Sequence, residues 1–168
     1  SGVRRVLTGD TTGELFSLTT GERLELLKLA LEYFPGLVLF QAGGGPLGET
    51  IDLAQEAQKL GADAIAAMAP IGWPDAPTEG VVEYLRCVEE VVEVPLILCD
   101  GPGGRMTAGI LAKVPHVTLN DSIHPSANSE PELTIRPSAG DIATLKQLLR
   151  TKIKGYPVAV RPPLTPVG

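Results

Sequence analysis

The sequence has few of the residues that mark several large classes of protein. It holds only two cysteines in 168 residues, Cys87 and Cys99, in very different expected settings, so no disulfide framework is indicated. The 14 lysines and arginines are scattered, the net charge is −6, and a nucleic-acid surface would need a basic stripe. No apolar run approaches the ~18–20 residues that cross a bilayer, and no signal-peptide pattern opens the chain. These absences predict a cytoplasmic globular protein that binds neither nucleic acid nor membranes.

Glycine and proline are abundant instead, with 19 and 15 residues. They cluster at 42–46, 69–77, 100–104 and 158–168, mostly just after apolar runs, which is typical of loops at one end of a sheet. The three glycines at 43–45 lack the lysine and the spacing of a phosphate-binding or dinucleotide-binding loop. We interpret them as a strand-end turn that lets the backbone approach the barrel mouth.

Strand-like and helix-like segments alternate strictly along the first two thirds of the chain. This order, with short connections, predicts parallel strands in one α/β domain. Two architectures are compatible with this order, a doubly wound open sheet and a (β/α)8 barrel. The expected strands are 2–7, 37–42, 62–70, 95–100 and 116–121, and the expected helices are 18–34, 48–61, 77–94 and 107–114.

Helix ends carry local signals. Thr19 and Glu22 have the spacing of a capping box, Gly61 stands where a helix ends, and Thr78 is the expected N-cap of the third helix. After Ser122 the alternation fails, and only residues 141–155 regain a helical period. A complete eight-unit barrel typically needs ~250 residues, so 168 residues are too few for one.

Several stretches resemble the dihydrodipicolinate synthase and N-acetylneuraminate lyase family of class I aldolases. The likeness lies in "TTGELFSLTTGER" (11–23), "QAGGGPLGETIDLAQEAQKLGADAIAAMAP" (41–70), "VPLILCDGP" (94–102), "VTLNDS" (117–122), "SANSEPEL" (126–133) and "VRPPLTP" (160–166).

This resemblance implies a (β/α)8 barrel, a single domain over 1–168, in which family strands 2–6 are legible at 3–121 and 122–168 is fragmentary. The first strand and helix of the family and later segments are missing. We expect the sequence to be part of a longer chain, because a barrel with excised strands would expose apolar edges. The alternative is a truncated α/β sheet that completes itself by oligomerising. The family likeness implies a homo-oligomer, commonly a tetramer.

In the family a lysine at the end of the sixth strand forms a Schiff base with pyruvate. The matching residue here is Asn120, whose amide lone pair is delocalised and cannot form an imine. The proton-relay tyrosine of the family corresponds to Cys99, next to Asp100, and the two tyrosines of the Pro-Tyr-Tyr motif correspond to Ile71 and Gly72. A cysteine at the end of an apolar strand is more often a small core residue than an acid–base group.

The part of the family site that binds the substrate carboxylate is better preserved. Thr11, Thr12 and Gly13 match the family's Thr-Thr-Gly loop, and Arg105 lies one residue out of register with an arginine that binds the substrate carboxylate. The resemblance implies no cofactor, and His116 and His124 show no metal-ligand spacing.

Two functions of different class follow. One is a lyase that acts on pyruvate or another 2-oxo acid through a non-standard site around Thr11, Thr12, Cys99, Asp100 and Asn120. The other is a catalytically silent relative that binds a small carboxylate or a protein partner. Asn120 is the sequence feature that distinguishes these two functions, because the usual lyase reaction requires an amine at that position.

Overall fold

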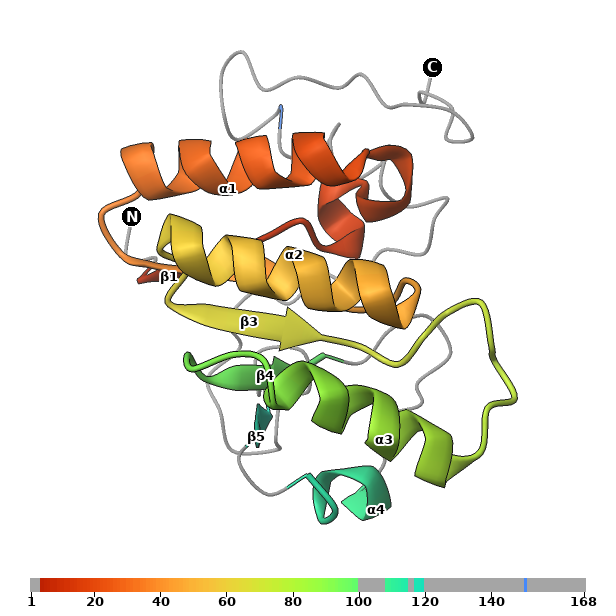
Figure 1. The fold of residues 1–168 in the computed structure, drawn as a ribbon. Coiled ribbons are helices and arrows are strands. Elements are labelled where there is room, and N and C mark those ends of the chain that lie inside the picture. The colour runs from red at the N-terminus through yellow and green to blue at the C-terminus, as the bar shows by residue number, and fades with distance from the viewer. Residues whose placement is uncertain (1–3, 100–107, 115–116, 120–149, 151–168) are drawn as a thin grey trace.

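The computed structural model describes residues 4–99, 108–114, 117–119 and 150, and these form one parallel sheet with helices between the strands (Figure 1). The strand order is β1-β2-β3-β4-β5, so each new strand is added beside the previous one. A doubly wound sheet would reverse direction at a switch point, whereas the wall of a barrel keeps this order. The strands are β1 (Arg5–Thr8), β2 (Leu37–Gln41), β3 (Ala64–Ala67), β4 (Leu96–Leu98) and β5 (Val117–Leu119).

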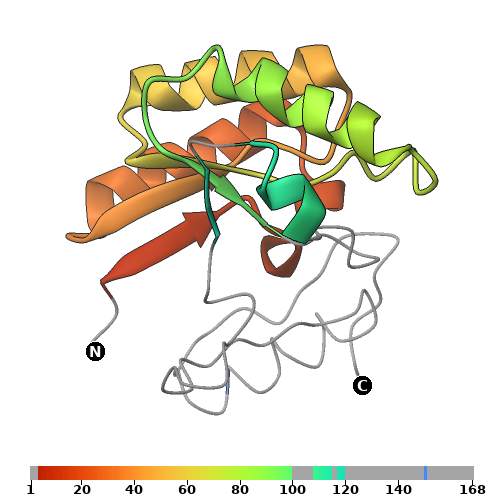
Figure 2. The same ribbon diagram turned by 90° about the horizontal axis from the view of Figure 1, so that it is seen from below.

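The three long helices cover one face of this sheet (Figures 1 and 2). Every strand and helix expected from the sequence up to residue 119 has a counterpart among the described residues, and β2, β3 and β4 are shorter than expected. The helices are α1 (Thr20–Tyr33), α2 (Leu47–Leu60), α3 (Thr78–Glu89) and α4 (Ala108–Leu111), and two short 3-10 turns, η1 (Thr11–Gly13) and η2 (Leu15–Ser17), follow β1.

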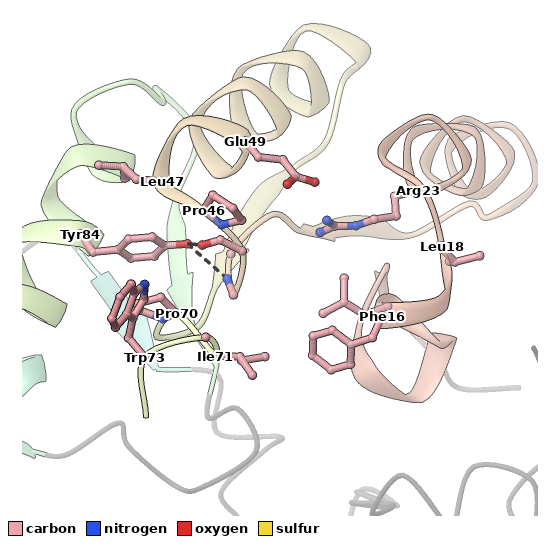
Figure 3. Close-up of a pocket in the computed structure, with 15 residues that line it drawn as sticks. Phe16, Leu18, Arg23, Pro46, Leu47, Glu49, Pro70, Ile71, Trp73 and Tyr84 are labelled. Carbon is pink, nitrogen blue, oxygen red and sulfur yellow. Dashed lines mark hydrogen bonds between the residues drawn. The ribbon is translucent and has the colours of Figure 1, made fainter. Parts of the chain in front are cut away.

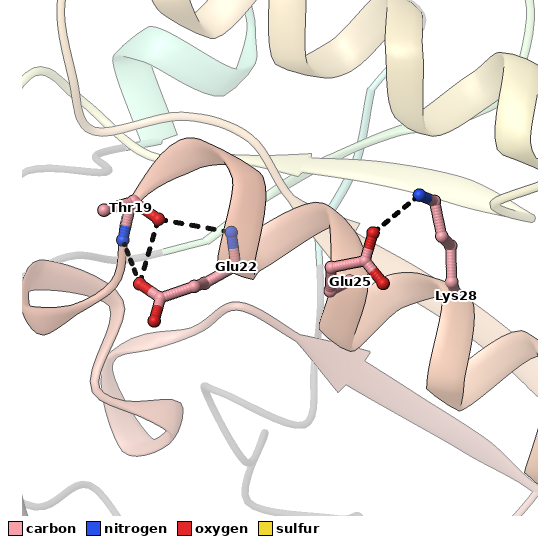
Figure 4. Close-up of polar contacts among 4 residues, drawn as sticks. All are labelled: Thr19, Glu22, Glu25 and Lys28. Atoms are coloured by element: carbon pink, nitrogen blue, oxygen red, sulfur yellow. Dashed lines mark hydrogen bonds and ion pairs between the residues drawn. The ribbon is translucent and has the colours of Figure 1, made fainter.

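The start of α1 confirms the predicted capping box (Figure 4). The Thr19 backbone N–H donates to Glu22 Oε2 at 2.9 Å, and the Glu22 N–H donates to Thr19 Oγ1 at 3.3 Å. Two backbone donors that have no partner within the helix are thereby satisfied. One turn further on, the exposed ion pair between Lys28 and Glu25 spans 2.7 Å and adds little to stability.

The ends of α2 and α3 give one confirmation and one correction. Gly61 closes α2 with a left-handed φ of 106°, as expected for a glycine at this position. The prediction that Thr78 caps α3 is wrong, because Pro77 is the N-cap and Thr78 is the first helical residue. The proline ring holds φ near the value that precedes a helix, so the helix begins without a side-chain cap.

The two faces of the sheet carry two apolar clusters. The larger one, the helix-side core, joins Val38, Phe40 and Ile65 of the strands to Leu27 of α1 and Leu53 of α2. Alternate strand residues point to the opposite face, where they form a smaller inner-face cluster of Leu15, Ala66, Met68 and Cys99, flanked by Leu7 and Ile71. This division follows the period of two along each strand, and the inner face is the one that lines the interior of a barrel.

Among the helices that the structure describes, none has both the length and the apolar character required to span a membrane.

Candidate functional site

An open cleft lies at the carboxyl ends of β1, β2 and β3, where the loops after these strands meet (Figure 3). Its volume is about 570 Å³, which suits a small organic ligand. In α/β barrels this end of the sheet holds the functional residues. The walls come from the turns after β1, the glycine loop after β2 and the segment after β3, and they consist of Leu15, Phe16, Leu18, Arg23, Gly43, Gly44, Gly45, Pro46, Leu47, Glu49, Pro70, Ile71, Gly72, Trp73 and Tyr84.

The glycine loop forms one wall because no side chain fits there. A Cβ on Gly43 would lie 2.6 Å from the backbone N of Met68 and 2.8 Å from Cα of Ala67. Gly44 has a φ of 100°, a conformation that side chains rarely adopt, and its carbonyl accepts the N–H of Ile71 at 3.0 Å. The segment 43–45 comes just after β2, which confirms its interpretation as a strand-end turn.

Tyr84 of α3 holds the same loop from the other side. Its hydroxyl donates to the Gly45 carbonyl at 3.0 Å and accepts the Gly44 N–H at 3.3 Å. The Thr50 hydroxyl lies 2.7 Å away, and because a phenol has one proton, Thr50 is the donor in that bond. Burial raises the pKa of Tyr84, although its hydrogen bonds and the nearby Arg23 guanidinium act in the opposite direction.

Arg23 of α1 brings a positive charge into the cleft, although the residue is only 7% exposed. One guanidinium nitrogen, Nη2, donates to the backbone carbonyls of Gln41 and Ala42 at the end of β2. The guanidinium carbon also lies 5.7 Å from the centre of the Phe40 ring. Its Nε is buried and has no hydrogen-bond partner among the residues that the structure describes.

Glu49, in the first turn of α2, carries the opposite charge. Its Oε1 accepts the Thr20 hydroxyl at 2.9 Å. Arg23 and Glu49 extend toward each other across the cleft (Figure 3), yet they are not among the ion pairs formed within the described part of the chain. Burial lowers the pKa of Arg23, and the Glu49 carboxylate partly counteracts that effect. The two charges therefore face each other with space between them.

Of the residues that the sequence suggested for the site, the structure describes Thr11, Thr12, Gly13 and Cys99. Thr11, Thr12 and Gly13 form η1, where Thr11 Oγ1 lies 3.4 Å from Asp10 Oδ1, and none of the three lines the cleft. Cys99 follows β4 and is fully buried in the inner-face cluster. Asp100, Arg105 and Asn120 lie outside the described residues, so their roles remain predictions.

The sequence analysis did not single out Arg23, Glu49 or Tyr84. Arg23 and Tyr84 carry a signal in retrospect, since each occupies a position in the apolar stripe of its helix, beside Leu27 in α1 and beside Val81 and Val88 in α3. A polar residue in such a stripe is one to examine as part of a site. Within the described part of the chain, no group of three histidine, cysteine, aspartate or glutamate residues is placed to hold a metal ion.

Comparisons with known proteins define the class of protein. A sequence profile of the dihydrodipicolinate synthetase family matches residues 1–117, and the chain belongs to this family. The fold is accordingly the (β/α)8 barrel of the class I aldolases, represented here in part.

The individual relatives are distant. The 4-hydroxy-tetrahydrodipicolinate synthase of Leptothrix cholodnii is 29% identical over 150 residues, covering 88% of this chain and 48% of that protein. The same enzyme from Nitratiruptor is 38% identical over 97 residues, covering 55% of this chain and 32% of that protein. The chain thus spans less than half the length of these relatives.

Solved structures agree with this assignment. Dihydrodipicolinate synthase from Cyanidioschyzon merolae, solved with lysine bound, superposes with a TM-score of 0.63 at 26% identity, covering 67% of this chain and 40% of that one. A 2-keto-3-deoxygluconate aldolase variant from Sulfolobus solfataricus, in complex with pyruvate, gives 0.63 at 27% identity, covering 70% and 41%.

Proposed function

We propose that this protein binds pyruvate or another 2-oxo acid without forming the Schiff base that starts aldol chemistry. The observation that carries this proposal is Asn120, the residue after β5 in the sequence, to which the family resemblance assigns the position of the reactive lysine. A carboxamide nitrogen has no available lone pair for attack on a ketone, so the covalent route is closed at that residue.

The other catalytic positions support the same proposal. Ile71 and Gly72 line the cleft, at the positions where the family resemblance places two tyrosines. Neither residue has a side-chain group that can donate or accept a proton. The Cys99 thiol, at the position of the relay tyrosine, is enclosed by Leu15, Ala66 and Met68. The homo-oligomeric state that the resemblance implies and the cytoplasmic location that the composition predicts remain predictions.

Borohydride trapping with pyruvate, followed by intact-mass measurement, tests this proposal. We expect no covalent adduct on the wild-type chain, whereas the Leptothrix cholodnii synthase serves as the positive control. The Asn120→Lys variant is the matched gain-of-function test. An adduct on wild-type protein would show that another amine does the chemistry and would overturn the proposal.

The non-covalent half of the proposal needs a separate measurement. We expect pyruvate to raise the melting temperature of the wild-type protein and to do so less for Thr12→Val, which removes a hydroxyl from the predicted carboxylate site. Thr78→Val, an exposed threonine at the start of α3, is the control. Absence of any pyruvate effect on the wild type would argue for the alternative in which the chain is a silent relative with another partner.

A second candidate function is the binding of a free amino acid in the cleft. The facing charges of Arg23 and Glu49 favour it, because they match the carboxylate and ammonium groups of a zwitterion. The relative from Cyanidioschyzon merolae was solved with lysine bound, which shows that an amino acid binds a member of this fold. Calorimetric titration with amino acids, on wild-type protein and on Glu49→Gln, tests this function, and equal affinities for the two proteins would contradict it.

A further inference from the structure

One side of α1 carries large apolar side chains that the rest of the described chain leaves in water. Leu26, Leu29 and Tyr33 follow one another at helical spacing and are 38%, 50% and 73% exposed. The buried residues of α1, Arg23 and Leu27, lie on a different side of the helix, toward the sheet. We call Leu26, Leu29 and Tyr33 the outer stripe of α1. Apolar groups gathered on an exposed helix side favour a partner, because covering them removes apolar area from water.

The outer stripe faces away from α2. The Thr20 hydroxyl donates to Glu49 of α2 at 2.9 Å, which marks the side of α1 that meets this neighbour. At 3.6 residues per turn, the members of the outer stripe lie roughly 120–180° around the helix from Thr20. α1 stands at the end of the row of long helices, with α2 beside it on one side (Figure 1). Among the helices that the structure describes, none covers the outer stripe.

The sheet is open on the same side of the molecule. α1 packs on β1 and β2, and β1 is the first strand in the order of the sheet. Among the described strands, β1 pairs only with β2, and its residues are exposed or half-buried, whereas four of the five residues of β2 are buried. A strand edge with unpaired backbone donors and acceptors pairs readily with another strand. The outer stripe and the edge of β1 therefore form one open surface.

A second copy of the chain matches both parts of this surface at once. α1 runs antiparallel to β1, because it returns the chain to the start of the parallel strand β2. A twofold axis between two such edges makes the two β1 strands antiparallel and the two α1 helices antiparallel. Edge pairing and burial of the outer stripe then occur in one contact, with Leu29 of each copy against the stripe of the other.

The charges favour the same arrangement. Glu22 and Glu25 lie in the first half of α1. Arg4 and Arg5 lie at the other end of the helix, where the Leu37 N–H that follows α1 donates to the Arg4 carbonyl at 3.0 Å. In the antiparallel contact, the acidic half of each helix lies beside the arginines of the other copy. A parallel contact would bring like charges together.

We propose that a second copy of this chain docks on the outer stripe of α1 and the edge of β1 about a twofold axis. The two five-stranded sheets then join into one continuous sheet, with the two α1 helices packed on the same face. This inference does not depend on the proposed function, since no residue of the outer stripe lines the cleft.

The mass of the protein in solution is the first test, measured by light scattering after size-exclusion chromatography over a dilution series. We expect the wild type to have at least twice the chain mass of 17.6 kDa at the higher concentrations. A wild type that keeps the mass of one chain throughout would overturn the proposal. The occupant of this surface would then be another segment of a longer chain or a different protein.

A substitution in the outer stripe identifies the face that is used. Leu29→Glu is expected to raise the dissociation constant of the assembly at least about tenfold, because each carboxylate loses its water in the contact. Thr78→Glu makes the same change in charge at an exposed residue of α3 and is expected to stay within about twofold of the wild type. Leu29→Glu assembling as tightly as the wild type would overturn the proposal, because association would then use another face.

A charge reversal tests the antiparallel direction. Arg4→Glu places a carboxylate beside the acidic half of the other α1 and is expected to weaken association at least about threefold at low ionic strength. Lys59→Glu makes the same reversal at an exposed residue of α2 and is expected to leave the dissociation constant unchanged. Equal effects of the two variants would overturn the twofold arrangement. Arg4 is exposed and precedes β1, so this variant decides the question even if Leu29→Glu does not fold.

Discussion

Removal of the Tyr84 hydroxyl is the change whose effect the structure specifies best. This one oxygen makes three contacts, with the Thr50 hydroxyl, the Gly44 N–H and the Gly45 carbonyl. In Tyr84→Phe the ring remains, so the helix-side core is still filled, and the three polar groups lose their partner together.

The expected cost follows from how buried these partners are. Gly44 and Thr50 are buried and Gly45 is half-buried, so water replaces the phenol poorly at two of the three contacts. A hydrogen bond contributes about 1 kcal/mol net, and a buried group left without a partner costs about 1–3 kcal/mol. We therefore expect Tyr84→Phe to lower the free energy of unfolding by about 2–4 kcal/mol, a large fraction of the ~5–15 kcal/mol typical of a domain.

Urea denaturation followed by far-UV circular dichroism measures this loss. Tyr33→Phe is the matched control, because Tyr33 is 73% exposed and its substitution is expected to stay within about 0.5 kcal/mol of the wild type. A double-mutant cycle with Thr50→Val isolates the hydroxyl–hydroxyl contact. A loss below about 0.5 kcal/mol for Tyr84→Phe would refute the reasoning, since the glycine loop would then not depend on the phenol.

Three further predictions concern single positions. Thr19→Ala removes the capping box of α1 and is expected to cost about 1 kcal/mol in urea denaturation; an unchanged midpoint would show that the cap is not needed. Gly43→Ala is expected to destabilise the protein by about 1–3 kcal/mol, because the new Cβ would contact the Met68 backbone. Gly48 in α2 has open space around it, so Gly48→Ala is expected to stabilise the protein by roughly 0.5–1 kcal/mol. A higher melting temperature for Gly43→Ala than for Gly48→Ala would contradict this. Burial raises the pKa of Tyr84, so above the ordinary tyrosine pKa of about 10 the folded state keeps a proton that the unfolded chain releases. The free energy of unfolding of the wild type should therefore fall as pH rises through that range, and that of Tyr84→Phe should fall less. Parallel pH profiles of the two proteins would exclude the effect.

The sequence predicted the elements whose ends depend on local contacts. The capping box of α1 involves residues three positions apart, and Gly61 ends α2 through its own backbone conformation, so both were predictable. Strand ends were predicted less well, because a strand ends where its neighbour stops pairing. The segment 62–70 was expected to be extended throughout, but the strand β3 covers only Ala64–Ala67, where β2 and β4 offer partners.

The cleft was not predictable from local pattern, because its contacts join distant parts of the chain. Tyr84 reaches a loop 40 residues earlier, and Thr20 donates to a carboxylate 29 residues later. The periods of a helix and a strand relate only residues a few positions apart, so they cannot predict such contacts. The family resemblance directed attention to Thr11, Cys99 and Asn120 instead, and a resemblance to reactive residues does not identify the side chains that line a neighbouring cavity.

The two proposed sites rest on different elements, and this makes their tests independent. Imine formation depends on the residue that follows β5, whereas the cleft is built from α1, α2, α3 and the loops after β1, β2 and β3. None of the described residues that line the cleft belongs to the segment after β5, so replacing Asn120 with lysine is expected to change pyruvate trapping and to leave amino-acid affinity unaltered. Glu49→Gln is expected to do the reverse. If either variant changed both measurements, the two functions would share one site, and the separation between chemistry at the residue after β5 and recognition in the cleft would have to be abandoned.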